Sequence, residues 1–191
     1  TSLTEVPARV TASAPSKVNL ALRVGAADQQ GYHALATVFE ALSLREYVTA
    51  ELHPGAPGGL PSVETRVYRP GSDQLELGGE SALDEEATAQ MAALDPATHL
   101  AVRAAVALGA DARVKLAVHK TVPVAGGMAG GSADAAAALV AVNQLLGLGL
   151  DLDQLQVVGR TLGADVPACL VGGVALGTGR GDHMDLLRAG T

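Results

Sequence analysis

Apolar and polar residues alternate with period two along the first third of the chain, which is typical of half-buried β-strands. The clearest example is KVNLALRVG, residues 17–25, where every second side chain is apolar. We expect this apolar face to be half-buried and Lys17 and Asn19 to share the opposite surface. The apolar positions are Val18, Leu20, Leu22 and Val24.

Further strands are expected over residues 37–44 and 45–53, and a weaker one over residues 62–69. Between the last two lies PGAPGGLP, residues 54–61, whose prolines and glycines exclude regular structure and indicate a loop between antiparallel strands. Residues 69–95 are acidic and irregular, so we expect a surface connection there with about one turn of helix.

From residue 96 onward the apolar period becomes helical. Residues 96–109 begin with proline and end before a glycine stop, which favours a helix. A second helix is predicted from Ser132 to about Leu146, and a shorter one over residues 151–163 with acidic residues in its first turn. The second helix carries an apolar stripe that we expect to be buried: Leu139, Val142, Leu145 and Leu146.

Residues 112–120 alternate again, and residues 173–184 are predicted to form a strand that runs into a glycine turn. Strands come first and are then mixed with helices, without the regular β-α-β alternation of a parallel sheet. The pattern predicts an α+β fold, with a mostly antiparallel sheet packed against helices. No repeat or linker divides residues 1–191, so we expect one domain.

Composition narrows the class of ligand. Of the 191 residues, 48% are apolar and 17% charged, which is typical of a globular protein, but only 2% are aromatic and none is isoleucine. The core must therefore be built from Val, Leu and Ala. A net charge of −7 argues against a nucleic-acid partner, which needs a basic face, yet it is compatible with a small phosphorylated ligand.

The single cysteine, Cys169, permits no internal disulfide and fits a reducing compartment. The first residues lack the apolar core of a signal peptide, and no apolar run reaches membrane-spanning length. We therefore expect a cytoplasmic protein with small-molecule partners and without nucleic-acid or membrane partners, either as a monomer or as a homodimer.

The stretch PVAGGMAGGSADAAAALV, residues 123–140, places four glycines in six residues directly before an alanine-rich run. Pro123 is expected to close the preceding strand, and the glycines to permit positive φ and to bare backbone N–H groups. Ser132 is the predicted N-cap of the following helix, whose free N–H groups and dipole favour an anion. The alternative is a strand-to-helix turn without a ligand, which needs fewer glycines.

Two familiar phosphate loops fit this stretch poorly. A P-loop requires lysine directly after glycine, and no lysine here follows a glycine. The dinucleotide-binding fingerprint is nearly met by Ala125, Gly127 and Gly130, with Asp151 further on. However, its first glycine is missing and no β-α-β unit surrounds it.

Three other constellations could carry chemistry. Lys17 and Asn19 could be a solvated pair or part of a site, and Tyr32-His33 could be exposed polar aromatics or a stacking ring and a hydrogen-bonding imidazole for a base. Asp165, in the mostly apolar LGADVPA, could be a helix cap or a partly desolvated general base.

Taken together, these motifs resemble one branch of the GHMP kinase superfamily. SKVNL, GYH, HKTVPVAGGMAGGSADAAAAL and TLGADVP occur there in the same order and at similar spacing, and the resemblance spans roughly residues 14–181. The glycine stretch is similar to the superfamily pattern Pro-x-x-x-Gly-Leu-Gly-Ser-Ser-(Ser/Ala)-Ala, with Met128 for Leu and Ala129 for the second Gly. The resemblance implies the α+β fold of the N-terminal lobe of a GHMP kinase.

It also implies an activity: ATP-dependent phosphorylation of the 2-hydroxyl of 4-diphosphocytidyl-2-C-methyl-D-erythritol, in the non-mevalonate route to isoprenoids. Asp165 would be the general base, and Lys17 would orient the hydroxyl and screen charge. Asn19, Tyr32 and His33 would hold the substrate, the tyrosine by stacking on the cytosine. The residues implied in ATP binding are Lys120, Pro123, Gly126, Gly127, Met128, Ala129, Gly130, Gly131 and Ser132.

Mg²⁺ is implied with ATP, and Ser132 is the hydroxyl expected near it, since no acidic cluster marks a dedicated metal site. Two features depart from the family. His99 stands where asparagine usually precedes leucine, which puts a nucleotide contact at that position in doubt. The second, C-terminal GHMP domain is expected to be missing or truncated. Another small-alcohol kinase, or a catalytically silent nucleotide-binding module, are the alternatives.

Overall fold

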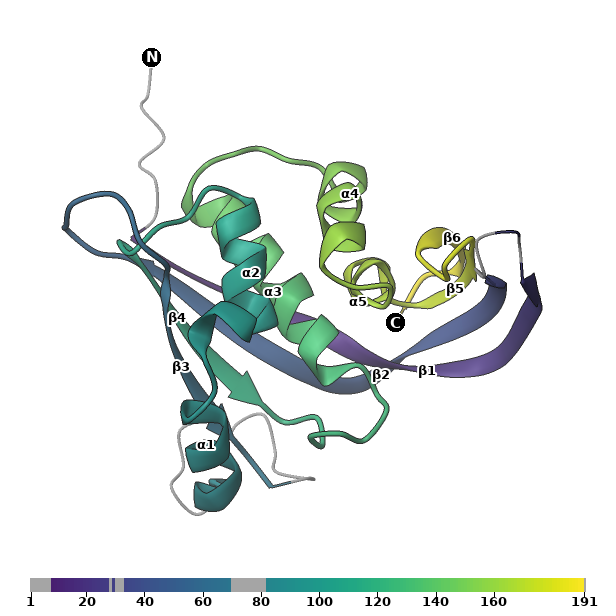
Figure 1. The fold of residues 1–191 in the computed structure, drawn as a ribbon, viewed down its shortest axis with the longest axis horizontal. Helices are drawn as coiled ribbons and strands as arrows, with labels where there is room; N and C mark the ends of the chain where they lie inside the picture. Colours follow the sequence, from purple (N-terminus) through teal and green to yellow (C-terminus); the bar gives the residue numbers. More distant parts are fainter. Residues whose placement is uncertain (1–7, 28, 30–32, 70–81, 191) are drawn as a thin grey trace.

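The computed structural model describes residues 8–27, 29, 33–69 and 82–190, which form a six-stranded sheet packed against helices (Figure 1). The strands are β1 (Arg9–Ala27), β2 (His33–Leu52), β3 (Ser62–Val67), β4 (Val114–Lys120), β5 (Val174–Thr178) and β6 (His183–Arg188). The helices are α1 (Glu85–Ala92), the short 3-10 helix η3 (Pro96–Thr98), α2 (Leu100–Ala107), α3 (Gly130–Leu145), α4 (Leu152–Leu162) and α5 (Val166–Val171).

The 20-residue strand β2 organises the sheet. One of its edges pairs with β1 along most of its length, while the other pairs with β5 over Thr37–Glu40 and with β4 over Tyr47–Leu52. Only β3 and β4 are parallel, and the other pairs are antiparallel. This confirms the α+β fold with a mostly antiparallel sheet, although the strands predicted over residues 37–44 and 45–53 form one continuous strand.

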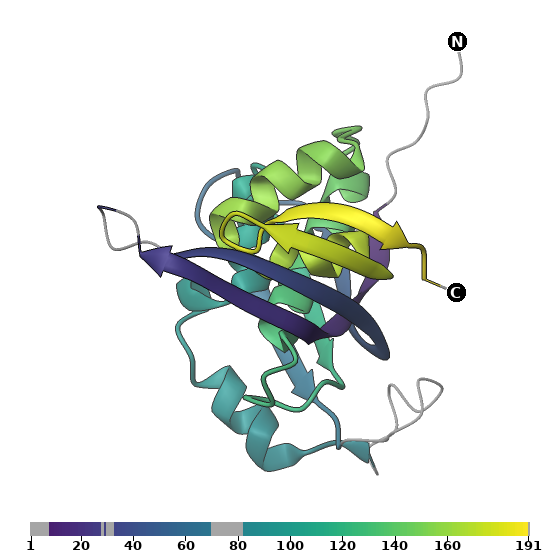
Figure 2. The same cartoon turned by 90° about the vertical axis from the view of Figure 1, so that its right-hand side faces the viewer.

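The expected burial of the first strand is wrong in its outer half. Leu20, Leu22 and Val24 are 57%, 54% and 58% exposed. The pairing of β1 with β2 shifts register between Pro15 and Lys17 and again between Asn19 and Ala21, so a strict period of two no longer assigns faces. In Figures 1 and 2 this part of β1 and β2 extends as a ribbon beyond the helices.

Helix α3 forms the centre of the core. It packs on β1 and β2 and is flanked by α2 and α5. Leu139, Val142 and Leu145 are fully buried as the apolar stripe predicts, whereas Leu146 is half-buried. The alanines are buried as well, so the helix is covered on nearly every side and small side chains allow neighbouring elements to approach it closely. These alanines are Ala133, Ala135, Ala136, Ala137, Ala138 and Ala141.

The start of α3 differs from the prediction. Its N-cap is Ala129, and Ser132 lies inside the first turn, so the predicted serine cap is wrong. Strand β4 ends at Lys120, three residues before Pro123. Of the four loop glycines only Gly127 has a positive φ, 71°; two alanines, Ala125 and Ala129, adopt φ of 60° and 59° instead.

Two of the other glycines serve close approach rather than backbone conformation. A Cβ on Gly126 would lie 3.2 Å from the carbonyl oxygen of Pro123, and one on Gly130 would lie 3.0 Å from Oε1 of Glu46. The loop therefore places its backbone strain on alanine and its tight packing on glycine.

The remaining elements agree in part with the sequence. Helix α4 has an acidic residue, Asp153, in its first turn and ends at Gly163, as predicted. The structure adds a capping box at Asp151. The helix predicted over residues 96–109 is interrupted at His99, which separates η3 from α2. Helix α1 is longer than the single turn expected, and β6 was not predicted. Within the described part of the chain, no helix has both the length and the apolar character needed to cross a membrane.

Replacing Ala129 by glycine should stabilise the protein, because a left-handed conformation costs an alanine about 1–2 kcal/mol and glycine very little. We expect a net gain of about 0.5–1 kcal/mol after the added entropy of the unfolded chain, measured by urea denaturation. Ala136→Gly is the control: this buried alanine lies inside α3, so glycine should destabilise by about 1 kcal/mol or more. A destabilised Ala129→Gly variant would contradict the strained cap.

Candidate functional site

The glycine loop forms the wall of a cavity of about 350 Å³. The residues predicted to bind ATP line it together, with the exception of Ser132. The opposite wall is largely apolar, with Met91 and Leu94 next to the loop that enters η3. The cavity thus combines bare backbone at a helix N-terminus with an apolar wall, which suits an anionic ligand that carries a flat ring.

The predicted catalytic residues meet beside this loop. Lys17 is buried, and its Nζ lies 3.2 Å from Oδ1 of Asp165 and 4.8 Å from the ring centre of Phe39. The backbone N–H of Lys17 donates to the carbonyl of Met128, which ties β1 directly to the glycine loop. A lysine and a carboxylate from opposite ends of the described chain are therefore held next to the proposed phosphate cradle.

Asp165 occupies the N-cap position of α5, but its carboxylate accepts no hydrogen bond from the first turn. Its side chain is 38% exposed and faces Lys17. Of the two roles left open by the sequence, a structural cap does not fit this geometry, while an accessible carboxylate next to a cation does.

Cys169 lies one turn after Asp165 and is buried. Its burial is the main cause that raises the pKa of its thiol to about 12, and the negative charge of Asp165 is the second. This cysteine is therefore a neutral packing residue.

Asn19 joins the same group. Its Oδ1 accepts from Lys17 Nζ at 2.7 Å, and its Nδ2 donates to Oγ1 of Thr37 at 2.7 Å, so the amide orientation is fixed at both ends.

The predicted Tyr32-His33 pair is described only in part. His33 lies at the start of β2, where its exposed ring contacts the carbonyl of Gly25 at 2.8 Å through Nδ1. Tyr32 lies outside the described residues.

Lys120 lines the cavity as expected, but its charge is engaged by the protein. Nζ lies 3.0 Å from Oε1 of Glu46 and 2.6 Å from Oδ2 of Asp134. The second oxygen of Glu46 accepts the backbone N–H of Thr121 at 2.7 Å. All three charged side chains are buried, and Oδ1 of Asp134 has no protein partner.

Burial dominates the electrostatics of this group. It raises the pKa of Glu46, with repulsion from Asp134 as the second cause, and it raises the pKa of Asp134 despite the opposing charge of Lys120. Burial alone lowers the pKa of Lys120, but the two carboxylates outweigh it and leave this pKa raised. Removing one member of such a buried group costs about 3–5 kcal/mol, because a charge is left without a partner.

His99, which departs from the family pattern, is the N-cap of α2. Its Nδ1 accepts the N–H of Ala101 at 3.2 Å, so the proton of the neutral ring resides on Nε2, which donates to Oγ1 of Thr65 at 3.2 Å. Burial, together with the nearby charge of Lys120, lowers its pKa to about 4. Both ring nitrogens therefore serve the fold, although the ring also lines the cavity.

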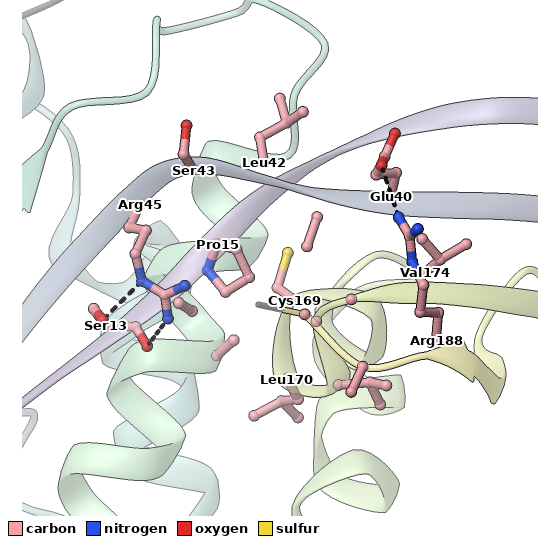
Figure 3. Close-up of a pocket in the computed structure, with 18 of the residues that line it drawn as sticks. Ser13, Pro15, Glu40, Leu42, Ser43, Arg45, Cys169, Leu170, Val174 and Arg188 are labelled. Atoms are coloured by element: carbon pink, nitrogen blue, oxygen red, sulfur yellow. Dashed lines mark hydrogen bonds and ion pairs between the residues drawn. The ribbon is translucent and has the colours of Figure 1, made fainter.

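A larger cavity of about 620 Å³ lies between β1, β2 and α5 (Figure 3). Arg45 donates to Ser13 at one end, and Arg188 pairs with Glu40 at 3.9 Å at the other. None of the catalytic, ATP-binding or substrate-binding residues predicted from the sequence lines this cavity. The candidate site is therefore the glycine-loop cavity with the adjoining Lys17–Asp165 pair.

The family model for the GHMP kinases N terminal domain matches residues 98–173, which include the glycine loop, α3 and Asp165. Over these residues the chain is similar to the GHMP kinases. The fold agrees: a crystal structure of L. major mevalonate kinase in complex with R-mevalonate superposes with a TM-score of 0.59 at 18% identity, over 90% of this chain and 50% of that one.

Nearer relatives carry one name. The 4-diphosphocytidyl-2-C-methyl-D-erythritol kinase of Kineococcus radiotolerans is 48% identical over 93% of this chain and 49% of its own length. The protein of the same name from Streptomyces coelicolor is 45% identical over 95% of this chain and 54% of its own. A crystal structure of 4-(cytidine 5'-diphospho)-2C-methyl-D-erythritol kinase gives a TM-score of 0.60 at 31% identity, over 93% of this chain and 55% of that one. The chain spans about half the length of the curated relatives it matches.

Two residues of the site were missed by sequence reasoning. Asp134 could have been noticed, because it stands near the start of an alanine run and aspartate is a poorer helix former than alanine. Glu46 gave no such signal, since it lies in an ordinary strand and meets Lys120 across 74 residues of sequence.

The buried neutral His99 should make the protein sensitive to acid. Below pH 6.5, the ordinary pKa of histidine, His99 binds a proton in the unfolded state, whereas in the folded state it binds one only near pH 4. Stability is therefore lost as pH falls through this window, by up to about 3 kcal/mol. His99→Asn keeps a capping side chain but does not titrate. Urea denaturation at pH 4.5 to 7.5 should show the wild type losing its advantage over this variant with falling pH; parallel curves would contradict the assignment.

Proposed function

We propose that the chain is the ATP- and substrate-binding domain of a kinase that phosphorylates the 2-hydroxyl of 4-diphosphocytidyl-2-C-methyl-D-erythritol. The observation that carries this proposal is the Lys17–Asp165 pair, held at 3.2 Å beside the glycine loop. The relatives named for this reaction support the substrate, with 48% identity in the first of them.

The residues in place match the needs of phosphoryl transfer, which depends on positioning and charge neutralisation. ATP supplies the phosphoryl group when it is bound. Asp165 takes the proton of the 2-hydroxyl as that oxygen bonds to the γ-phosphorus and ADP leaves. Lys17, oriented by Asn19, holds the hydroxyl toward the carboxylate and neutralises charge that builds up between acceptor and donor.

The glycine loop is the proposed phosphate cradle. Gly127 has open space where a Cβ would stand, and the first N–H groups of a helix such as α3 have no partner within the helix, which suits an anion. Among the described residues, no three or more His, Cys, Asp or Glu side chains are grouped to hold a metal ion. Mg²⁺ commonly binds through substrate phosphates with few protein ligands, and the Ser132 hydroxyl in the first turn fits that mode.

Tyr32 and His33 are proposed to recognise the cytidine, by stacking and hydrogen bonding. We further propose that a second GHMP domain lies outside residues 1–191, since the chain spans about half of its relatives. The intact mass of the native protein tests this point. A cytoplasmic location and a monomeric or homodimeric state remain predictions.

Acceptor specificity tests the assignment against another small-alcohol kinase. We expect turnover with the cytidyl substrate and at least 100-fold lower kcat/KM with methylerythritol phosphate or mevalonate, because these lack the cytidine. Comparable rates on all three would contradict the roles of Tyr32 and His33. Calorimetry with an ATP analogue and the cytidyl ligand, beside a coupled kinase assay, separates a silent module: binding without turnover would favour it.

Asp165→Asn should lower kcat by at least about 100-fold, the range for loss of a general base, with ligand affinities little changed.

Lys17→Ala should lower kcat by a similar factor, because it leaves the charge of Asp165 uncompensated close to phosphate. Asp185→Asn and Lys115→Ala, both exposed on strands, are matched controls that should keep the wild-type rate. Near-normal turnover in Asp165→Asn would remove it from the role of base.

A further inference from the structure

The buried charges of Glu46, Lys120 and Asp134 lie at the two ends of the glycine loop. Lys120 is the last residue of β4, just before the loop, and Asp134 lies in the second turn of α3, just after it. Glu46 reaches both ends from β2: one oxygen contacts Lys120 and the other accepts the N–H of Thr121. The loop is thus closed at its base by side chains from three elements.

The contacts leave little freedom at this closure. Oε1 of Glu46 lies only 3.0 Å from the place where a Cβ on Gly130 would stand, so the carboxylate packs directly on the first turn of α3. Thr121 also donates its hydroxyl to the carbonyl of Arg45 at 2.6 Å, next to Glu46 in β2. The distance between the two ends of the loop is therefore fixed by charge-assisted hydrogen bonds among buried side chains.

Burying one cation with two carboxylates is costly, and an apolar group of the same volume would stabilise the fold as well or better. The arrangement makes sense where geometry matters more than stability. A phosphate cradle is such a place, because its N–H groups must keep their positions within about 0.5 Å and their directions within about 20°.

From this geometry we infer that Glu46, Lys120 and Asp134 are positioning residues that hold the glycine loop in its phosphate-binding shape, and that Lys120 acts through the carboxylates rather than as a direct phosphate ligand. The inference rests on the proposed function, since it requires that the loop bind the phosphates of ATP. It assigns a role to Glu46, which lies outside the sequence motifs, and to Asp134, which lies within the glycine-loop motif but was given no role from the sequence.

Glu46→Gln is the decisive variant, because it keeps the size of the side chain and an acceptor for Thr121 but removes the charge that holds Lys120. We expect affinity for MgATP to fall at least tenfold by calorimetry, while affinity for cytidine 5′-diphosphate, the probe for the other subsite, changes less than twofold. Amide hydrogen exchange over residues 124–131 should become faster. Glu51→Gln, the same change at a surface ion pair five residues further along β2, is the control and should alter none of these.

Glu46→Asp provides a second route if the glutamine variant fails to fold. It keeps the charge but is one methylene too short to contact Lys120 and Thr121 together, so the same selective loss of MgATP affinity is expected. A folded variant of either kind that binds MgATP as the wild type does would overturn the positioning role and leave the proposed function standing. A wild-type protein that binds cytidine 5′-diphosphate but no MgATP would overturn the proposed function itself.

Discussion

The close packing of α3 on the sheet is the contact on which the rest of this structure depends. Its alanines carry no bulk that would hold the neighbouring elements away, and they are buried on almost every side. Because α3 contacts β1, β2 and α5, it brings the elements that carry Lys17, Glu46 and Asp165 to one end of a single helix. That end is the first turn, where the glycine loop delivers its N–H groups. The small side chains of this helix therefore allow functional residues from distant segments of the sequence to lie close together.

The sequence predicts the elements whose packing is local and regular. The alternation in β4, the end of α4 at Gly163 and the approximate length of α3 follow from periodicity and end signals, and the structure confirms them. Where the pairing of β1 with β2 shifts register, alternation no longer identifies the buried face, and Leu20 and Leu22 are exposed. The position of a bulge depends on how the strand pairs with its neighbour, so it cannot be read from the sequence of the strand alone.

The same division applies to the candidate site. Lys17, Asn19 and Asp165 could be proposed because the motifs around them resemble a family, and the structure brings these three side chains together. The contact between Glu46 and Lys120 could not be predicted, since nothing in either segment points to the other. Whether a charge is buried depends on the tertiary structure. A glutamate in a strand gives no sign in the sequence that a lysine from a different strand pairs with it.

The backbone of the glycine loop is strained at two alanines. Glycine is expected wherever φ is positive, yet two of the three positive φ values between residues 125 and 129 belong to alanines, at a cost of about 1–2 kcal/mol each. Such strain persists only where the surroundings determine the conformation. Here they do so from both sides, through the ion group at the base of the loop and the hydrogen bond from Lys17 to Met128. An alanine in that position has fewer conformations than a glycine, so the loop gains rigidity from a residue type that fits its dihedral angles less well than glycine does.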